Sequence, residues 1–427
     1  MADVRVAQIR RKRAVYLVLS TVTLLFLGLI YAFSAFKAPM VESFNVPIDR
    51  VGVTFNIMMI TFCLGALLGS QIEKKVGVRG AIFSSAVMFA VGFIGTALFA
   101  QGNVCMIWIF YGAIGGLGVG IGYNSVIATT NVWFPDKVGL SSGILMMGFG
   151  LGALIIGSLI SVPIYNATHN LSMILIALGI ISAIVTGIEG ILIQRPPADI
   201  VELMAPDKVS SSGYDPADED KALKSPIFYV YWLWAIIVIA VGLATIGDTA
   251  GAATSFGGWL AAFASLLVGL VSALNGVGRV LVGIIYDKTD VKVTMAIDGI
   301  VAIVATLCII AAFITNTPVL YIVGAFCCGF CYGGVPVVAS AFGRQRFGAK
   351  NYPLNLSLCN FAIVFGSLLN LIIGTFVGAG SDHYLPLFII LFVLSILSLL
   401  DVIPFSKIWN RDQKVLAQRR QERSTEN

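Results

Sequence analysis

One arginine stands inside a long apolar stretch of this chain. Arg279 lies in the segment ALNGVGRVLVGIIYDK (273–288), eight residues before Asp287. If the segment is helical, with a rise of about 1.5 Å per residue, Arg279 lies roughly 12 Å from its polar end. A guanidinium presents its N–H donors in a planar fork that matches the two oxygens of a carboxylate. The chemistry that Arg279 predicts is therefore the binding of a carboxylate anion in apolar surroundings.

Asn275 stands one helical turn before this arginine and, in a helix, on the same face. Its amide group fits two tasks in such a site. It can hold the guanidinium in one orientation, or it can bind a hydroxyl group next to the carboxylate of the ligand. The sequence leaves both tasks open.

An acid elsewhere in the protein is the alternative partner for Arg279. The buried candidates are Glu189, Asp298 and Asp248. Glu189 and Asp298 are each six residues from a basic residue that marks the polar end of their own apolar segment, and Asp248 stands near the opposite end of its segment. None of the three is predicted at the depth of Arg279, so a bound anion is the leading interpretation and an internal ion pair the alternative.

The composition identifies the elements that must position these residues as membrane-spanning helices. Of the 427 residues, 58% are hydrophobic and only 11% are charged, whereas about 25% are charged in a soluble domain. Several apolar runs exceed the roughly 20 residues that cross a ~30 Å hydrocarbon core. Arg279 would lie near the middle of this core, where an arginine costs at least ~2.5–3.5 kcal/mol. The sequence predicts an all-α polytopic membrane protein.

Twelve such spans are predicted. They cover residues 14–38, 51–72, 80–100, 104–131, 139–162, 171–193, 226–248, 258–286, 293–314, 318–341, 353–378 and 384–405. The first follows a basic start but is long for a signal peptide, so we interpret it as a membrane helix. The polar segment 194–225 divides the chain into two six-helix bundles, 1–193 and 226–405, and residues 406–427 form a tail.

The distribution of basic residues predicts the orientation in the membrane. All of the 27 Lys and Arg residues except Lys37, Arg50 and Arg279 fall at the two ends of the chain, in the linker, or in loops after even-numbered spans. Such segments are expected on the cytoplasmic side of the inner cell membrane, with both termini inside. The net charge of +5 is accounted for by residues that face lipid headgroups, and no nucleic-acid partner is expected.

Two loops are similar in the two halves. SQIEKKVGVRG (70–80) and GIIYDKTDVKV (283–293) align with an offset of 213 residues, which pairs Lys75 with Lys288 and Arg79 with Lys292. A parallel repeat of this kind is a common plan of transporters. Both loops resemble the signature of the major facilitator superfamily. The resemblance implies gating roles for Glu73, Lys75, Arg79, Asp287 and Lys288, although Lys74 stands where the family has aspartate in the first loop.

A more specific resemblance comes from GVGIGYNSVIATTNVWFPDKVGLSSG (118–143). This segment resembles the oxalate/formate antiporter family and the related bacterial monocarboxylate transporters. The resemblance implies that Tyr31, Tyr123 and Tyr332 line the transport cavity, and the alternative for each is a packing or interfacial role. The glycine run lies within a span and follows no strand, so it predicts close helix packing rather than a nucleotide site.

The charge of the ligand is inferred from a second resemblance. Dicarboxylate exchangers of this family carry a lysine on span eleven, where this chain has Cys359 followed by Asn360, and residues 351–380 contain neither Lys nor Arg. A dianion such as oxalate would leave one carboxylate without a counter-charge in a low-dielectric site. The sequence therefore predicts a monocarboxylate partner of the lactate, pyruvate, formate or acetate type, bound by Arg279, Asn275, the three tyrosines, Cys359 and Asn360.

The predicted function is secondary transport by alternating access, with the two halves moving around a central site. Proton symport is the first interpretation, with Asp248 and Lys37 near the outer mouth as candidates for proton coupling, and Lys37 equally suits a snorkelling role. Anion exchange of the oxalate/formate type is the alternative. A drug exporter or a sensor with the transporter fold is the second alternative.

No enzyme, cofactor or metal site is predicted. The apolar segments offer no paired acids and no nucleophile beside a base. Cys327, Cys328 and Cys331 are close in sequence but have no histidine or carboxylate nearby, so helix packing is the favoured interpretation of the three thiols.

Overall fold

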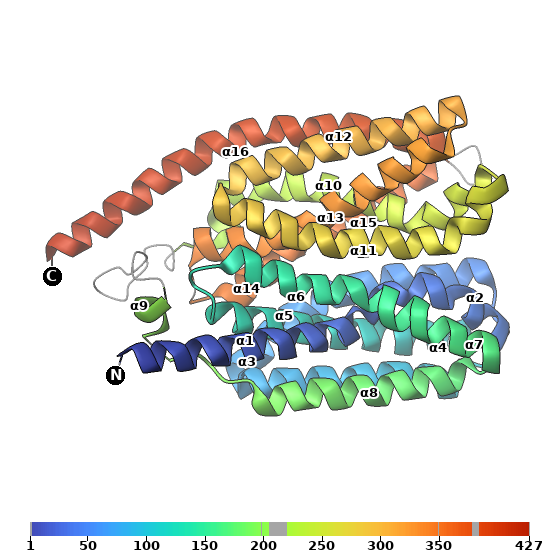
Figure 1. Ribbon diagram of the computed structural model, residues 1–427, viewed down its shortest axis with the longest axis horizontal. Helices are drawn as coiled ribbons and strands as arrows, with labels where there is room; N and C mark the ends of the chain where they lie inside the picture. Colours follow the sequence, from blue (N-terminus) through green and yellow to red (C-terminus); the bar gives the residue numbers. More distant parts are fainter. Residues whose placement is uncertain (1, 198, 205–219, 349, 378–383, 427) are drawn as a thin grey trace. The chain divides into compact units, whose positions relative to one another are not determined.

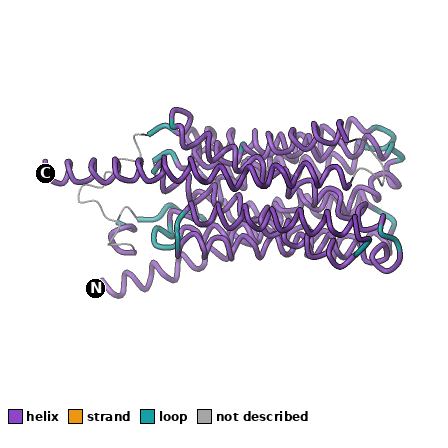
Figure 2. Tube along the Cα trace, turned by 90° about the horizontal axis from the view of Figure 1, so that it is seen from above, coloured by secondary structure: helices purple, strands orange, loops and turns teal. Residues whose placement is uncertain are grey.

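The structure is a computed structural model that describes residues 2–197, 199–204, 220–348, 350–377 and 384–426 (Figure 1). All regular secondary structure over these residues is helical (Figure 2). The predicted all-α class is therefore confirmed.

Eleven helical segments within these residues are long and apolar enough to cross a membrane. One of them, α3 (Ile48–Phe99), has 52 residues and contains two of the predicted spans. The two parts meet at Gly77, whose backbone angles (φ 79°, ψ 170°) interrupt the helix in a region that only glycine adopts readily. Eleven helical segments thus accommodate the twelve predicted spans.

The chain forms two compact units. Unit 1 comprises Met1–Phe134 and Ile144–Pro197, and unit 2 comprises Pro135–Gly143 and Ala198–Asn427. The first nine residues after Phe134 therefore belong with unit 2, although they lie inside the first predicted bundle.

Unit 1 contains several interrupted helices. Its elements are α1 (Ala2–Leu27), a 3-10 turn (Gly28–Ala32), α2 (Phe33–Phe44), α3, α4 (Val104–Ile107), a π-helical segment (Trp108–Gly115), α5 (Gly116–Val132), α6 (Val138–Gly152), a second π-helical segment (Ala153–Ser161), α7 (Val162–Thr168) and α8 (Leu171–Leu192). α6 begins in unit 2 and ends in unit 1. Such interruptions are tolerated in membrane helices where neighbouring groups satisfy the freed backbone.

The glycine run of α5 serves helix packing, as predicted. A Cβ atom on Gly120 would overlap the carbonyl oxygen of Phe62 on α3, and one on Gly118 would lie 2.7 Å from the backbone nitrogen of Phe89. Only glycine allows two helices to approach this closely in a membrane.

Unit 2 consists mostly of longer helices. After α9 (Ile200–Met204) and a 3-10 turn (Ala222–Lys224) come α10 (Pro226–Ser255), α11 (Gly258–Lys288), α12 (Val291–Thr315), α13 (Pro318–Phe347), α14 (Tyr352–Asn360), α15 (Ala362–Val377) and α16 (Tyr384–Glu426). α16 continues as one helix through the region predicted as a tail (Figure 1). Trp409 and Leu416 of this region are buried. The predicted span 353–378 corresponds to α14 and α15, which Phe361 joins within one apolar segment, Tyr352–Gly374, long enough to cross a membrane.

Candidate functional site

The predicted pair on α11 is present in the structure. Arg279 is 1% exposed, and its Nε donates a hydrogen bond of 3.0 Å to the side-chain oxygen of Asn275, which is also buried. Because the amide is neutral, this bond orients the guanidinium without cancelling its charge. Asn275 thus performs the first of its two predicted tasks, and binding of a ligand hydroxyl stays a prediction.

Two of the three acids considered as partners of Arg279 are not bound to it. Glu189 on α8 accepts hydrogen bonds from Ser20 Oγ (2.6 Å) and Thr23 Oγ1 (3.5 Å) within unit 1. The two oxygens of Asp298 on α12 have no hydrogen-bond partner in the described part of the chain. The backbone of Asp248 belongs to α10, and its side chain lies outside the described residues.

Tyr332 lies on α13, next to the residue that packs against Asn275. Its side chain is buried and occupies space left by Gly242 of α10, where a Cβ would overlap the tyrosine. A Cβ on the neighbouring Gly333 would overlap the carbonyl oxygen of Asn275 on α11. Tyr332 therefore lies on α13 directly beside Gly333, the residue at which α13 contacts Asn275 of α11.

Cys359 and Asn360 are buried at the end of α14. The Cys359 sulfur would lie 3.5 Å from a Cβ on Gly343, and the thiol also lies near Tyr286. Tyr286 is seven residues beyond Arg279 on α11, which corresponds to about 10 Å along the helix. Cys359 therefore lies beside a part of α11 that is about 10 Å along the helix from the backbone of Arg279.

The other two predicted tyrosines meet in an aromatic cluster of unit 1. The ring of Phe149 on α6 makes edge-to-face contacts with Tyr31 (centroids 5.4 Å apart) and Tyr123 (4.8 Å), and Phe62 on α3 contacts Tyr123 at 5.2 Å. We call these four residues the aromatic cluster. The sequence did not identify Phe62 or Phe149, because a phenylalanine in a membrane span carries no local sign of its neighbours.

Lys37 on α2 is half-buried, and a Cβ on Gly52 would lie 3.3 Å from its Nζ. The ammonium group thus packs over a glycine at the start of α3. Its predicted role in proton coupling stays a prediction.

Asp287 binds the first turn of α6 within unit 2. Its carboxylate oxygens accept hydrogen bonds from the backbone nitrogens of Gly139 (3.0 Å) and Leu140 (2.8 Å). A carboxylate at a helix N-terminus satisfies otherwise unpaired N–H groups and interacts favourably with the helix dipole. This contact explains why residues 135–143 belong to unit 2, and it gives Asp287 a connection consistent with its predicted gating role.

The remaining predicted gating residues make looser contacts. Glu73 lies 3.7 Å from the guanidinium of Arg195, which is exposed. The side chains of Lys75, Arg79 and Lys288 are exposed as well. Exposed ion pairs and lone charges contribute little to stability, so the structure leaves the gating roles of these four residues as predictions.

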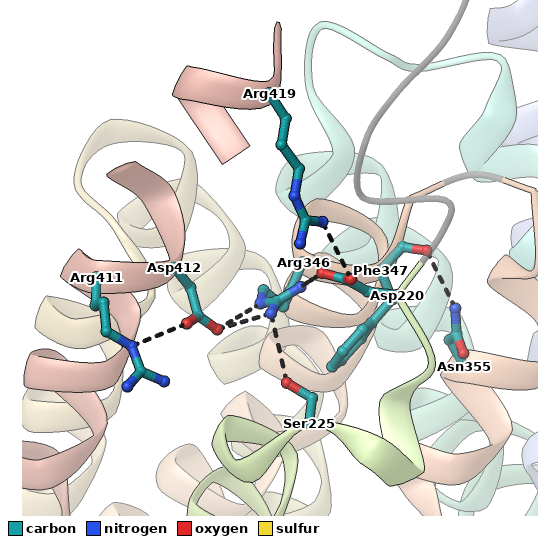
Figure 3. A network of polar contacts seen from close by, with 8 residues as sticks. All are labelled: Asp220, Ser225, Arg346, Phe347, Asn355, Arg411, Asp412 and Arg419. Atoms are coloured by element: carbon teal, nitrogen blue, oxygen red, sulfur yellow. Dashed lines mark hydrogen bonds and ion pairs between the residues drawn. The ribbon is translucent and has the colours of Figure 1, made fainter. Parts of the chain in front are cut away.

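A network of ion pairs, which the sequence did not predict, lies in unit 2 (Figure 3). At its centre, Arg346 at the end of α13 donates to Asp220 Oδ2 (2.6 Å) and, through Nε and Nη2, to Asp412 Oδ2 (3.0 and 2.7 Å). Arg419 on α16 lies 3.4 Å from Asp220, and Arg411 lies 3.8 Å from Asp412. The arginine joins the end of the linker to α13 and to the extended part of α16.

Arg346→Gln is expected to lower the stability of the protein by about 3 kcal/mol, because removing one partner of a buried ion pair leaves the other charges uncompensated. Arg411→Gln is the matched control, since the Arg346 side chain is 7% exposed and that of Arg411 71%. The melting temperature of both variants, purified in detergent, measures the effect. Equal melting temperatures for the two variants would contradict the prediction.

Comparison with known proteins identifies the class of the molecule. Residues 18–350 match the sequence profile of the Major Facilitator Superfamily, so the chain belongs to this family of membrane transporters and is not an enzyme. It is 24% identical to the uncharacterized MFS-type transporter YhjX of Escherichia coli, over 84% of this chain and 87% of that protein. It is 26% identical to the oxalate:formate antiporter of Oxalobacter formigenes, over 84% of each chain.

A more distant relative and a solved structure agree with this classification. Monocarboxylate transporter 13 of Bos taurus is 25% identical over 30% of this chain and 29% of its own. The structure of the proton:xylose symporter XylE superposes with a TM-score of 0.73 at 15% identity and covers 93% of this chain and 96% of its own. The predicted superfamily, and distant relationship to oxalate/formate and monocarboxylate transporters, are confirmed.

Proposed function

We propose that this multi-pass secondary transporter moves a small monocarboxylate across the cell membrane by alternating access, with both termini on the cytoplasmic side. Lactate, pyruvate, formate and acetate have the proposed chemistry. Proton symport is the proposed coupling mode, and exchange of one anion for another is the alternative, which the similarity to the oxalate:formate antiporter favours.

The observation that carries this proposal is the buried arginine of α11. Arg279 is held by a neutral amide within a membrane span, and a charge in such a place is a functional feature because its burial is costly. A guanidinium held at Nε can direct its terminal N–H groups at the two oxygens of one carboxylate. Tyr332 is proposed to add a neutral hydroxyl donor, and the cavity-lining roles of Tyr31 and Tyr123 stay predictions.

The choice of a single negative charge follows from the residues of α14. Cys359 is a thiol and Asn360 an amide, and both are buried. Neither side chain supplies a positive charge to a second carboxylate, and an unpaired carboxylate is costly in an apolar site. The structure of α14 thus favours a monocarboxylate over oxalate.

Uptake of radiolabelled lactate, pyruvate, formate, acetate and oxalate into proteoliposomes tests the proposal. We expect uptake of at least one monocarboxylate and an inward proton gradient that increases it, with oxalate transported at least tenfold more slowly. Uptake that requires an anion inside the vesicles, and that ignores the gradient, would establish exchange instead. Transport of oxalate as fast as any monocarboxylate would contradict the charge argument.

A further inference from the structure

Asp298 is a fully buried carboxyl group on α12. It is 0% exposed, and neither of its oxygens has a hydrogen-bond partner in the described part of the chain. Glu189, the buried acid of unit 1, is bound by two hydroxyl groups. Hydrogen bonds therefore offset the cost of burying the carboxyl group of Glu189, and no such bond offsets it for Asp298 among the described residues.

The space for this carboxyl group is provided by one glycine of α13. A Cβ on Gly334 would overlap Oδ2 of Asp298. The offset of 213 residues between the two halves pairs Asp298 with Ser85 on α3. Ser85 likewise lies against a glycine, Gly122, but its hydroxyl donates a 2.7 Å hydrogen bond to the carbonyl of Gly118. Unit 1 thus fills the corresponding position with a small neutral side chain, so helix packing alone does not require an acid here.

Among the residues that the structure describes, no basic side chain forms a hydrogen bond or an ion pair with Asp298. The neighbouring polar groups are the thiol of Cys331 on α13 and the indole of Trp234 on α10, which donates to the carbonyl of Met295 one turn before Asp298. An ionised carboxylate in such surroundings costs several kcal/mol. A bound proton removes this cost.

α13 connects this carboxyl group to the arginine site. Gly334 touches Asp298, and the adjacent Gly333 touches the carbonyl of Asn275, whose side chain holds Arg279. Any movement that follows ionisation of Asp298 therefore acts on the helix turn that packs against Asn275. The carboxyl group lies seven residues into α12, about 10 Å from the start of the helix, so water needs to penetrate only a short way to exchange its proton.

We propose that Asp298 is the proton-binding site of the transport cycle. It carries a proton in the conformation seen here and releases it in a conformation that admits water between α12 and α13. The movement of α13 that follows proton release then acts, through the contacts of Gly334 with Asp298 and of Gly333 with Asn275, on the carboxylate site. This inference rests on the proposed symport, and it assigns the proton to a residue other than Asp248 and Lys37.

The test compares two transport modes of Asp298→Asn, using the monocarboxylate that gives the highest wild-type uptake. Exchange of external substrate for substrate loaded inside the vesicles, without a pH gradient, needs no net proton movement. We expect the variant to retain this exchange within about twofold of the wild-type rate. Accumulation driven by an inward proton gradient, and the external alkalinisation that accompanies it, are expected to fall at least tenfold. Glu189→Gln is the matched control, a buried acid neutralised in the same way, and should retain both modes.

Asp298→Ser provides a second variant, because Ser85 shows that the fold accommodates serine at the corresponding position. Gradient-driven accumulation by either variant at the wild-type rate overturns the inference while the proposed symport stands. Loss of exchange together with a lower melting temperature in both variants also overturns it, since the residue is then structural. If wild-type uptake itself ignores the gradient, the proposed symport fails first, and the inference fails with it.

Discussion

Replacement of Arg279 by lysine is expected to reduce monocarboxylate uptake by roughly 10- to 100-fold. Lysine keeps the positive charge but replaces the planar fork by one ammonium group on a flexible stem. A single ammonium group cannot replace both the Nε that binds the side-chain oxygen of Asn275 and the fork proposed to bind the two oxygens of a carboxylate. The loss of one charge-assisted hydrogen bond costs about 1.5–3 kcal/mol, which corresponds to the stated range.

Initial rates of uptake at low substrate concentration measure this effect, together with the melting temperature. Arg411→Lys is the control, because that side chain is 71% exposed and makes only a 3.8 Å ion pair. We expect wild-type uptake from the control and an unchanged melting temperature for Arg279→Lys. Near-normal uptake by Arg279→Lys would mean that the site needs a charge and not a fork, and the proposed clamp would be wrong.

The part of the site that the sequence predicted is the part encoded by neighbouring residues on one helix. Arg279 and Asn275 are four residues apart, so the helical period alone places them on one face, and the structure joins them by a hydrogen bond. The cost of a charge in an apolar span indicated the function of the arginine without any knowledge of its surroundings. The bounds of most spans follow from the same local reasoning.

Contacts between distant segments could not be predicted in this way. Phe149 joins Tyr31 to Tyr123, and Arg346 joins Asp220 to Asp412, over separations that no helical period covers. Hydropathy also identifies apolar length but not helix continuity. It therefore separates the two spans on either side of Gly77 but does not predict the short turn that joins them there.

Replacement of Gly333 by alanine is expected to reduce transport by about 100-fold. A Cβ at this position would overlap the carbonyl oxygen of Asn275, and backbone atoms cannot turn away as a flexible side chain can. α11 and α13 already touch one turn earlier, where a Cβ on Gly329 would lie 2.7 Å from the carbonyl of Val271. The helices must therefore separate or rotate, at a cost of about 1–3 kcal/mol for overpacking. A displacement of about 1 Å in a positioned group can cost 100-fold in rate.

Gly374→Ala is the matched control, because a Cβ on this helical glycine of α15 would have no neighbour within 4 Å. Alanine in an open helical position is expected to be neutral or to stabilise by about 0.5–1 kcal/mol. Uptake rates and melting temperatures of both variants separate a local effect on the arginine from general unfolding. If Gly333→Ala melts only a few degrees lower yet loses transport, the contact between α13 and Asn275 positions Arg279. Wild-type uptake by Gly333→Ala would show instead that the site tolerates movement of α11, and the link between Asn275 and α13 would have no functional weight.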